Sequence, residues 1–332
     1  MAQIVNRFPL VTIITPAYNR ANLITETIES VLSQDYPNLE YIVLDDGSTD
    51  ATRDIIKRYD GRLRWESHPN IGETLTVNKG FSLACGEIIG VVNSDDPLLP
   101  GAIRRAVETL LAKPSAVVAY PDWLLIDEFG KKLQVVRCRD FISRADMVRG
   151  HYCLPGPGAF FRRKVIERIG GRDPAFRYVG DFDFWLRAGL LGDFVRIPEV
   201  LATFRTHADS TSVLSPSEDM AMEHFHVIDN IFNDSILQND LKKIEDESYL
   251  NAYHAVVCYS GSRNLKTKVK YIYRSINSCP RKFILKYQYR IIIYVCLLMG
   301  IPYNDIYYKC SNIINEMKDK LRTCFGRPVM LL

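Results

Sequence analysis

The stretch that decides the fold is LEYIVLDDGSTD, residues 39–50. Its first six residues are rich in branched and aromatic side chains, which is typical of a buried strand. Asp45 and Asp46, followed by a glycine, end that strand, and the serine, threonine and aspartate at residues 48–50 are residues that commonly begin a helix. The segment therefore predicts a strand, a tight polar turn and a helix in succession.

The same alternation continues on both sides of this segment. Strand-like runs occur at residues 10–15, 39–44, 87–92 and 116–120, and apolar residues recur with helical spacing at residues 22–34, 74–84 and 101–111. Strands that alternate with helices predict an α/β fold, with a mostly parallel central sheet flanked by helices. Ligands of such sheets bind beyond the carboxyl ends of the strands, so the functional site is expected there.

The composition is that of an ordinary globular protein. The chain has 332 residues, of which 47% are hydrophobic and 24% are charged. Lys plus Arg exceed Asp plus Glu by 42 to 39, which gives a net charge of +3. This composition argues against a disordered or collagen-like chain, and so small a charge excess gives no reason to expect nucleic acid as a partner.

Several features favour a cytoplasmic location. The eight cysteines form no CxxC pair, as expected for buried thiols in a reducing compartment. Residues 1–10 contain no apolar run long enough for a signal peptide. The longest apolar stretch, residues 291–301, is shorter than the roughly 20 residues that a membrane-spanning helix needs. We therefore expect a cytoplasmic protein, bound at most peripherally to the inner face of the cytoplasmic membrane.

Polar and acidic residues follow three of the predicted strands. In chain order they are Thr15, Ala17, Tyr18 and Asn19, then Asp45 and Asp46, then Asn93, Ser94, Asp95 and Asp96. Four carboxylates at neighbouring strand ends would repel one another unless a cation or a donor-rich ligand lay among them. Each aspartate alone could instead cap the helix that follows it, but both pairs together favour a ligand site.

These segments resemble the motifs of family 2 glycosyltransferases. The motifs are TPAYNR at residues 15–20, YIVLDDGSTD at 41–50, GEII at 86–89, NSDD at 93–96, and GDFDFWLR at 180–187 followed by FRTH at 204–207. The resemblance covers roughly residues 8–210. It implies the GT-A fold, which is a Rossmann-like α/β fold, a nucleotide-sugar donor, a Mg²⁺ or Mn²⁺ ion, and sugar transfer with inversion at the anomeric carbon.

The resemblance implies which residues handle the metal ion and the diphosphate. Asp96 would bind the metal directly, and Asp95 would contact the sugar or the ribose. His207 would complete the metal shell or touch the diphosphate, although a lone histidine can also be structural. Lys79 and Arg205 would neutralise phosphate charge. This agrees with the chemistry, because a divalent cation held by oxygen ligands neutralises a diphosphate leaving group.

The resemblance also implies how the nucleotide is held. Asp46 would accept a hydrogen bond from an N–H of a pyrimidine base. Thr15 and Tyr18 would flank that base, with the Tyr18 ring available for stacking. Ala17 and Asn19 belong to the same donor-binding loop.

Inversion requires a base that takes the proton from the acceptor hydroxyl as it attacks. Asp181, at the start of a predicted helix, matches the family position of this base, and it could also cap that helix. Asp183 is the alternative. The sequence departs from the family pattern at Gly180, where an acidic residue is usual.

The last third of the chain differs in character. We expect a GT-A catalytic domain over residues 1–215 and a helical region over residues 216–332. Residues 261–290 carry nine basic side chains and no acidic one, interleaved with aromatic and aliphatic residues. This region either packs on the catalytic domain or rests on an anionic membrane surface through residues 261–301.

The sequence thus predicts an inverting glycosyltransferase. It would move a sugar from a nucleotide-diphosphate sugar, UDP- or dTDP-linked, to a glycan or lipid-linked acceptor in the biosynthesis of a surface polysaccharide or glycolipid. One alternative is a degenerate relative that binds nucleotide-sugar or glycan without turnover. Another is a sugar-phosphate nucleotidyltransferase, but that class needs a glycine-rich N-terminal loop and residues 15–20 contain no glycine.

Overall fold

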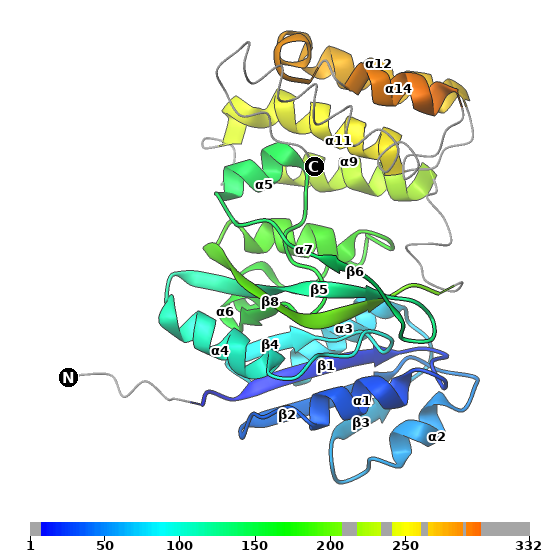
Figure 1. Cartoon of the computed structure of the whole chain (residues 1–332), viewed down its shortest axis with the longest axis vertical. Helices are drawn as coiled ribbons and strands as arrows, with labels where there is room; N and C mark the ends of the chain where they lie inside the picture. The colour runs from blue at the N-terminus through cyan, green and yellow to red at the C-terminus, as the bar shows by residue number, and fades with distance from the viewer. Residues whose placement is uncertain (1–7, 208–217, 234–240, 260–264, 288–289, 300–332) are drawn as a thin grey trace, which may run out of the picture. The chain divides into compact units, whose positions relative to one another are not determined.

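The computed structural model describes residues 8–207, 218–233, 241–259, 265–287 and 290–299. The chain divides into two compact units (Figure 1). Unit 1 comprises residues 1–144 and 153–210, and unit 2 comprises residues 145–152 and 211–332. The domain boundary predicted at residue 215 lies outside the described residues.

Unit 1 is built on an eight-stranded sheet with the order β3-β2-β1-β4-β7-β5-β6, and β8 pairs with β5. The strands are β1 (Val11–Ala17), β2 (Leu39–Asp45), β3 (Arg64–Ser67), β4 (Ile88–Val91), β5 (Ala116–Ile126), β6 (Lys132–Val136), β7 (Phe160–Arg162) and β8 (Asp193–Arg205). The pairs β1–β2, β1–β4, β2–β3 and β5–β8 are parallel, whereas β7 and β6 run antiparallel to their neighbours. The predicted α/β fold with a mostly parallel sheet is therefore confirmed.

Helices connect and cover the strands of unit 1 (Figure 1). They are α1 (Ile24–Leu32), α2 (Thr52–Lys57), α3 (Glu73–Leu83), α4 (Ala102–Ala112), α6 (Lys164–Ile169) and α7 (Gly180–Ala188). In α1 the buried residues Ile24, Ile28 and Val31 recur with the spacing that predicted this helix. All seven residues of β1 are buried, so this strand lies at the centre of the core.

The register of the parallel strands positions the functional site. Ala17 at the end of β1 lies beside Asp45 at the end of β2, and Ile14 of β1 lies beside Val91 of β4. The chain therefore leaves β1, β2 and β4 at the same edge of the sheet. Gly47 allows the turn after β2, because its φ is +73° and a Cβ there would lie 2.6 Å from the backbone nitrogen of Asn70.

The end of β8 reaches the same edge by a separate route. Leu98 forms an isolated antiparallel bridge with Ala202, and the Thr203 amide donates to the Pro97 carbonyl at 3.2 Å. The segment that follows the NSDD motif thus runs beside β8. This pairing brings the FRTH segment to the carboxylates that follow β4.

Unit 2 is helical among its described residues. It contains α5 (Arg144–Gly150, which begins at the last residue of unit 1), α9 (Glu218–Asn233), η1 (Lys242–Ile244), α11 (Glu245–Tyr259), α12 (Leu265–Ser278), α13 (Pro280–Lys282), the π-helix η2 (Phe283–Tyr287) and α14 (Arg290–Leu298). α11 packs against α9 and α12, with Phe225, Tyr253 and Tyr271 in mutual ring contact. No helix in the described part of the chain is both long and apolar enough to cross a membrane.

Candidate active site

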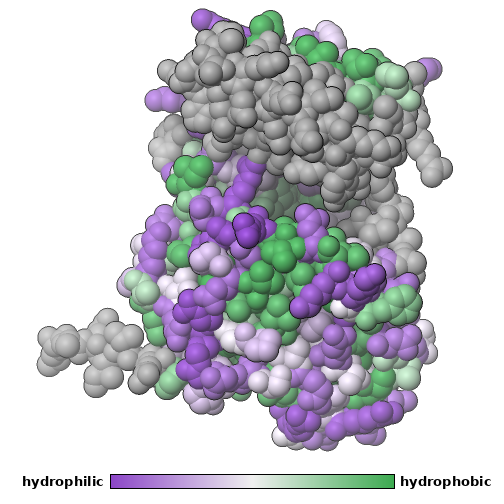
Figure 2. Space-filling view, viewed as in Figure 1, coloured by the Kyte–Doolittle hydropathy of each residue, from purple (hydrophilic) through white to green (hydrophobic). Residues whose placement is uncertain are grey.

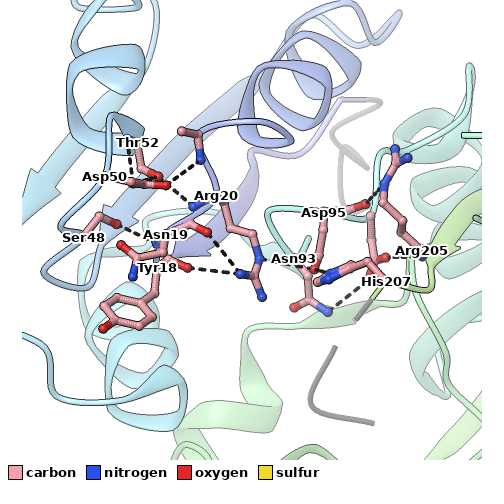
Figure 3. Close-up of polar contacts among 12 residues, drawn as sticks. Tyr18, Asn19, Arg20, Ser48, Asp50, Thr52, Asn93, Asp95, Arg205 and His207 are labelled. Carbon is pink, nitrogen blue, oxygen red and sulfur yellow. Dashed lines mark hydrogen bonds and ion pairs between the residues drawn. The ribbon is translucent and has the colours of Figure 1, made fainter. Parts of the chain in front are cut away.

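The loop after β1 is tied to the turn after β2 by hydrogen bonds. The Asn19 amide donates to Ser48 Oγ at 2.9 Å, and Asn19 Oδ1 accepts from the Thr49 amide at 2.8 Å. The Arg20 amide donates to Thr52 Oγ1 at 2.7 Å (Figure 3). Asn19 has a φ of 51°, a left-handed conformation that asparagine tolerates better than most residues. Asn19 therefore fixes the geometry of this loop.

The other residues predicted in this loop differ in exposure. Tyr18 is 45% exposed, so its ring is available to a ligand. Thr15 and Ala17 are buried within β1. The hydroxyl of Thr15 lies 3.1 Å from that of Tyr41. The Thr15 side chain is thus engaged inside the sheet rather than at its edge.

Asp45 and Asp46 both organise backbone. Asp45 accepts from the Ser48 amide at 3.2 Å and from Ser67 Oγ at 2.7 Å, which shapes the turn. Asp46 is buried, and its two oxygens accept from the amides of Ile71 at 2.7 Å and Gly72 at 3.0 Å. Asp46 thereby holds residues 68–72 against the end of β2.

The carboxylates after β4 form the polar centre of this edge. Asp95 Oδ2 lies 2.9 Å from His207 Nε2 and 3.4 Å from Arg20 Nε. Asp96 Oδ1 accepts from the Arg205 amide at 2.8 Å, and its Oδ2 accepts from Asn93 Nδ2 at 3.1 Å. The structure therefore brings Asp95, Asp96 and His207 together, as the sequence predicted.

The electrostatics of Asp96 are those of a buried carboxylate whose charge the nearby Arg205 offsets only in part. Burial raises the pKa of Asp96 above its ordinary value, and the adjacent charge of Asp95 raises it further. The hydrogen bonds from Arg205 and Asn93 oppose this shift without reversing it. A cation placed beside Asp96 would favour its ionised form.

The sequence did not predict the contacts that Arg20 and Arg205 make in this cluster. Arg20 lies between the Asn19 loop and Asp95, where its Nη1 donates to the carbonyls of Tyr18 and Asn19 (Figure 3). The sequence signal for it was its place in the TPAYNR motif. Arg205 was expected to face phosphate. Instead its side chain is buried, and it donates to the carbonyls of Asp95, Asp127 and Glu128 and to the carboxylate of Glu26.

Among the described residues, neither Lys79 nor Asp181 forms a hydrogen bond or an ion pair with the carboxylate cluster. Lys79 Nζ pairs with Glu66 at 3.0 Å. Asp181 is exposed in the first turn of α7, and its Oδ1 accepts from the Phe182 amide at 2.8 Å. Burial raises the pKa of the Cys153 thiol, and the charge of Asp181 raises it further, so the two side chains are close enough to interact.

The two acidic residues of α7 have different environments. Asp183 is buried, and its Oδ2 accepts from Arg187 Nε at 2.8 Å. Burial raises the pKa of Asp183, although the Arg187 guanidinium opposes this. Asp183 is therefore engaged in the core, whereas the exposed Asp181 can meet a substrate.

The residues present fit a divalent metal by their chemistry. Asp95, Asp96 and His207 offer oxygen and imidazole ligands, which suit Mg²⁺ or Mn²⁺, and Asp96 is a buried carboxylate without a cationic side chain in hydrogen-bond contact. In the described residues these side chains are not arranged as a preformed group of three metal ligands. His207 lies against Asp95, so that contact would have to open for both to bind one ion.

Comparison with known proteins identifies the class. Residues 12–170 match the sequence model of the family described as Glycosyl transferase family 2. A glycosyltransferase of Rickettsia prowazekii is 29% identical over 61% of this chain and 66% of its own length. The chondroitin synthase of Pasteurella multocida is 28% identical over 71% of this chain. Over residues 12–170 the chain is therefore similar to glycosyltransferase family 2.

Solved structures agree on the fold. TarS of S. aureus, in complex with UDP-GlcNAc, superposes with a TM-score of 0.61 and 17% identity over 81% of this chain and 89% of that chain. The mannosyltransferase PcManGT from Pyrobaculum calidifontis, in complex with GDP-Man and Mn²⁺, superposes with a TM-score of 0.56 and 18% identity over 96% of this chain and 88% of that chain. The predicted GT-A fold is confirmed.

The curated relatives are longer than the part that this chain matches. The aligned region is 41% of the length of a Rickettsia felis glycosyltransferase, which is 27% identical to this chain. It is 24% of the length of the chondroitin synthase.

The role of Arg205 can be tested by replacing it with glutamine. Arg205→Gln should lower the free energy of unfolding by roughly 3 kcal/mol, because the buried carbonyls of residues 95, 127 and 128 lose their donors. Urea unfolding followed by circular dichroism measures this change. Arg62→Gln, on an exposed pair with Glu29, should change stability by less than about 0.5 kcal/mol. Equal stability of both variants would contradict the assigned role.

Proposed function

We propose that the chain is a metal-dependent, inverting glycosyltransferase. It transfers a sugar from a UDP- or dTDP-linked donor to a glycan or a lipid-linked acceptor, in the biosynthesis of a surface polysaccharide or glycolipid. The observation that carries the proposal is the meeting of Asp95, Asp96 and His207 at the carboxyl edge of a parallel sheet. Support for the donor comes from the UDP-GlcNAc bound to TarS, and support for the product class comes from the chondroitin and hyaluronan synthases among the relatives.

The proposed metal site uses Asp96 as the direct ligand, with His207 beside it and Asp95 directed to the sugar or ribose. The Mn²⁺ in PcManGT supports this use of the fold. When bound, the ion supplies positive charge at the diphosphate leaving group. Arg20 contacts both Asp95 and the Asn19 carbonyl, so it would help to orient the donor between the loop after β1 and the carboxylates after β4.

The nucleotide would lie against the loops after β1 and β2. The exposed Tyr18 ring offers a stacking surface for the base. Asp46 already accepts from Ile71 and Gly72, so its remaining lone pairs would accept from the base N–H. Asn19 and Ala17 contribute loop geometry, and Thr15 supports the loop from within β1. Lys79, paired with Glu66, would have to leave that pair to reach a phosphate.

The proposed base is Asp181. Its carboxylate is exposed at the start of α7, while Asp183 is held in the core by Arg187. One Asp181 oxygen accepts from the Phe182 amide, which fixes the carboxylate and leaves the other oxygen for the acceptor hydroxyl.

Removal of the metal ligand should abolish metal-dependent donor binding. In titration calorimetry with UDP, Asp96→Ala should weaken the Mn²⁺-dependent affinity by at least about tenfold, because the ion loses its carboxylate ligand. Asp54→Ala, which removes an exposed carboxylate from α2, should bind UDP and Mn²⁺ as the wild type does. Unchanged Mn²⁺-dependent binding by Asp96→Ala would refute the metal role.

Removal of the base should separate binding from turnover. Asp181→Asn should keep the affinity for UDP and Mn²⁺, while the rate of UDP release from a UDP-sugar falls by about 10²–10⁴-fold, because the amide cannot accept the proton. Glu167→Gln on the exposed side of α6 is the matched control. If Asp181→Asn turns over at the wild-type rate, the base is another residue.

The described part of unit 2 also carries a surface that fits a membrane. Large apolar side chains are exposed there at Val269, Tyr273, Ile284, Leu285, Ile291, Val295, Leu298 and Met299. Ile291, Val295 and Leu298 of α14 recur at i, i+4 and i+7, so they form one exposed stripe along this helix. The basic residues Lys266, Lys270, Arg274, Arg281 and Lys282 are exposed on α12 and α13 (Figure 2 shows both hydrophobic and hydrophilic residues around these helices).

We propose that this surface rests on an anionic bilayer, which places the enzyme peripherally on the inner face of the cytoplasmic membrane. Apolar side chains enter the headgroup region while basic ones attract anionic lipid. Residues 261–264, 288–289 and 300–301 of the predicted segment lie outside the described residues.

Vesicle flotation tests the membrane surface. The double variant Ile284→Ser, Leu285→Ser removes two side chains that are 63% and 61% exposed, and should lower binding to phosphatidylglycerol vesicles by about tenfold or more. Phe129→Ser, at an 86% exposed residue of unit 1, should float as the wild type does. Equal flotation of the double variant and the wild type would contradict the proposal.

A further inference from the structure

Unit 2 contains an excess of positive charge around one buried carboxylate. Glu247 of α11 accepts from Lys282 Nζ at 2.7 Å, from Lys286 Nζ at 2.8 Å and from Tyr287 Oη at 2.7 Å. Burial opposes the ionisation of Glu247, but these hydrogen bonds lower its pKa to about 2, so it is charged. Arg149 Nε of α5 lies 3.8 Å from the same carboxylate.

A fourth cation lies next to these groups. The Cζ of Arg290 is 4.2 Å from the centroid of the Tyr287 ring, whose hydroxyl contacts Glu247. Arg290 Nη2 donates to Asn251 Oδ1 at 2.8 Å, and Asn251 Nδ2 donates to the carbonyl oxygens of Arg149 and Glu247. Three cationic side chains therefore lie at Glu247, and Arg290 lies beside the Tyr287 ring that contacts it. Together the four cations exceed the one carboxylate by three positive charges.

Several N–H donors of this cluster form no hydrogen bond with the described residues. Arg290 is 2% exposed, yet among the described residues its Nε and Nη1 have no hydrogen-bond acceptor and no carboxylate forms an ion pair with it. Arg149 Nε is also buried without a hydrogen-bond partner. A buried guanidinium with Asn251 Oδ1 as its only acceptor among the described residues is costly, because its charge and its other N–H groups lose the water that satisfied them.

Three of the four cationic side chains are partly exposed to solvent. The side chains of Lys282, Lys286 and Arg149 are 45%, 35% and 34% exposed, so the cluster runs from solvent to the buried Arg290. Arginine presents paired N–H donors that match phosphate oxygens, and lysine adds point charge. Ile284 and Leu285 lie between the two lysines in the chain and are exposed, which suits a phosphate attached to an apolar group.

We propose that Arg149, Lys282, Lys286 and Arg290 bind a phosphate group, either as inorganic phosphate or as the phosphate monoester of an anionic lipid. The site lies in unit 2 and is formed by residues other than those of the proposed donor site. Its existence does not depend on the proposed sugar transfer. The phosphate would accept from the free donors of Arg290 and from the lysine ammonium groups that Glu247 holds in place.

Calorimetry and thermal unfolding of the full chain with sodium phosphate, against sodium chloride of equal ionic strength, test the site. Phosphate should raise the melting temperature of the wild type. Arg290→Gln should weaken phosphate binding by about tenfold or more, because it removes a charge-assisted pair of hydrogen bonds. Without phosphate it should melt no lower than the wild type, because the substitution removes a buried charge that no described carboxylate neutralises. A purely structural arginine would instead lower the melting temperature on substitution.

Two further variants keep the test decisive if Arg290→Gln does not fold. Lys282→Gln, at the exposed end of the cluster, should also weaken phosphate binding, and Lys243→Gln, an exposed lysine of η1 outside it, should not. Asp96→Ala should keep the phosphate effect, which separates this site from the donor site. The proposal would be overturned if Lys282→Gln and Lys243→Gln bound phosphate equally. It would also be overturned if the wild type bound neither sodium phosphate nor vesicles that contain phosphatidic acid.

The source of the phosphate is distinguished by vesicles. Phosphatidylcholine vesicles that contain phosphatidic acid should retain the wild type and Lys243→Gln but lose Lys282→Gln if the group is a lipid phosphate monoester. If the vesicles retain Lys282→Gln and Lys243→Gln equally, while the two variants differ in their affinity for sodium phosphate, the site binds the free ion.

Discussion

Arg205 holds the backbone of Asp95 and the carboxylate of Asp96, so it fixes the segment that carries both acidic residues of the candidate site. Its amide donates to Asp96, its Nε donates to the carbonyl of Asp95, and its remaining donors reach Asp127, Glu128 and Glu26. It is the last residue of β8 and buried, so it acts as a fixed part of the sheet. The rest of the site depends on it because these hydrogen bonds fix the Asp95 backbone and the Asp96 carboxylate against the end of β8.

The two units handle charge in opposite ways. At the edge of the sheet in unit 1, carboxylates gather and the pKa of Asp96 rises, which is the environment that a cation stabilises. In unit 2, cations gather around Glu247 and the pKa of that carboxyl falls. Each cluster has an excess of one sign that the described side chains do not neutralise. Such an excess in a partly buried site indicates a ligand of the opposite charge.

Much of the architecture was predictable because it depends on local pattern. The spacing of Ile24, Ile28 and Val31 predicted α1, and the buried run before Asp45 predicted β2. The short β7 was not predicted, because three residues carry no period. Nor was β8, in which Pro198 interrupts the strand pattern. These two strands obtain their hydrogen bonds from β4 and β5, which the local sequence does not reveal.

The sequence by itself determined the alternation of strands and helices, the resemblance to a family and the acidic pairs after two of the strands, because these follow from periodicity and from short motifs. Only the tertiary structure decided the partners of the side chains. It engaged Asp183 with Arg187, turned Arg205 from phosphate to backbone, and left Arg290 buried without an acid. The physical reason is that the charge state and free donors of a buried group depend on neighbours that folding brings from distant parts of the chain.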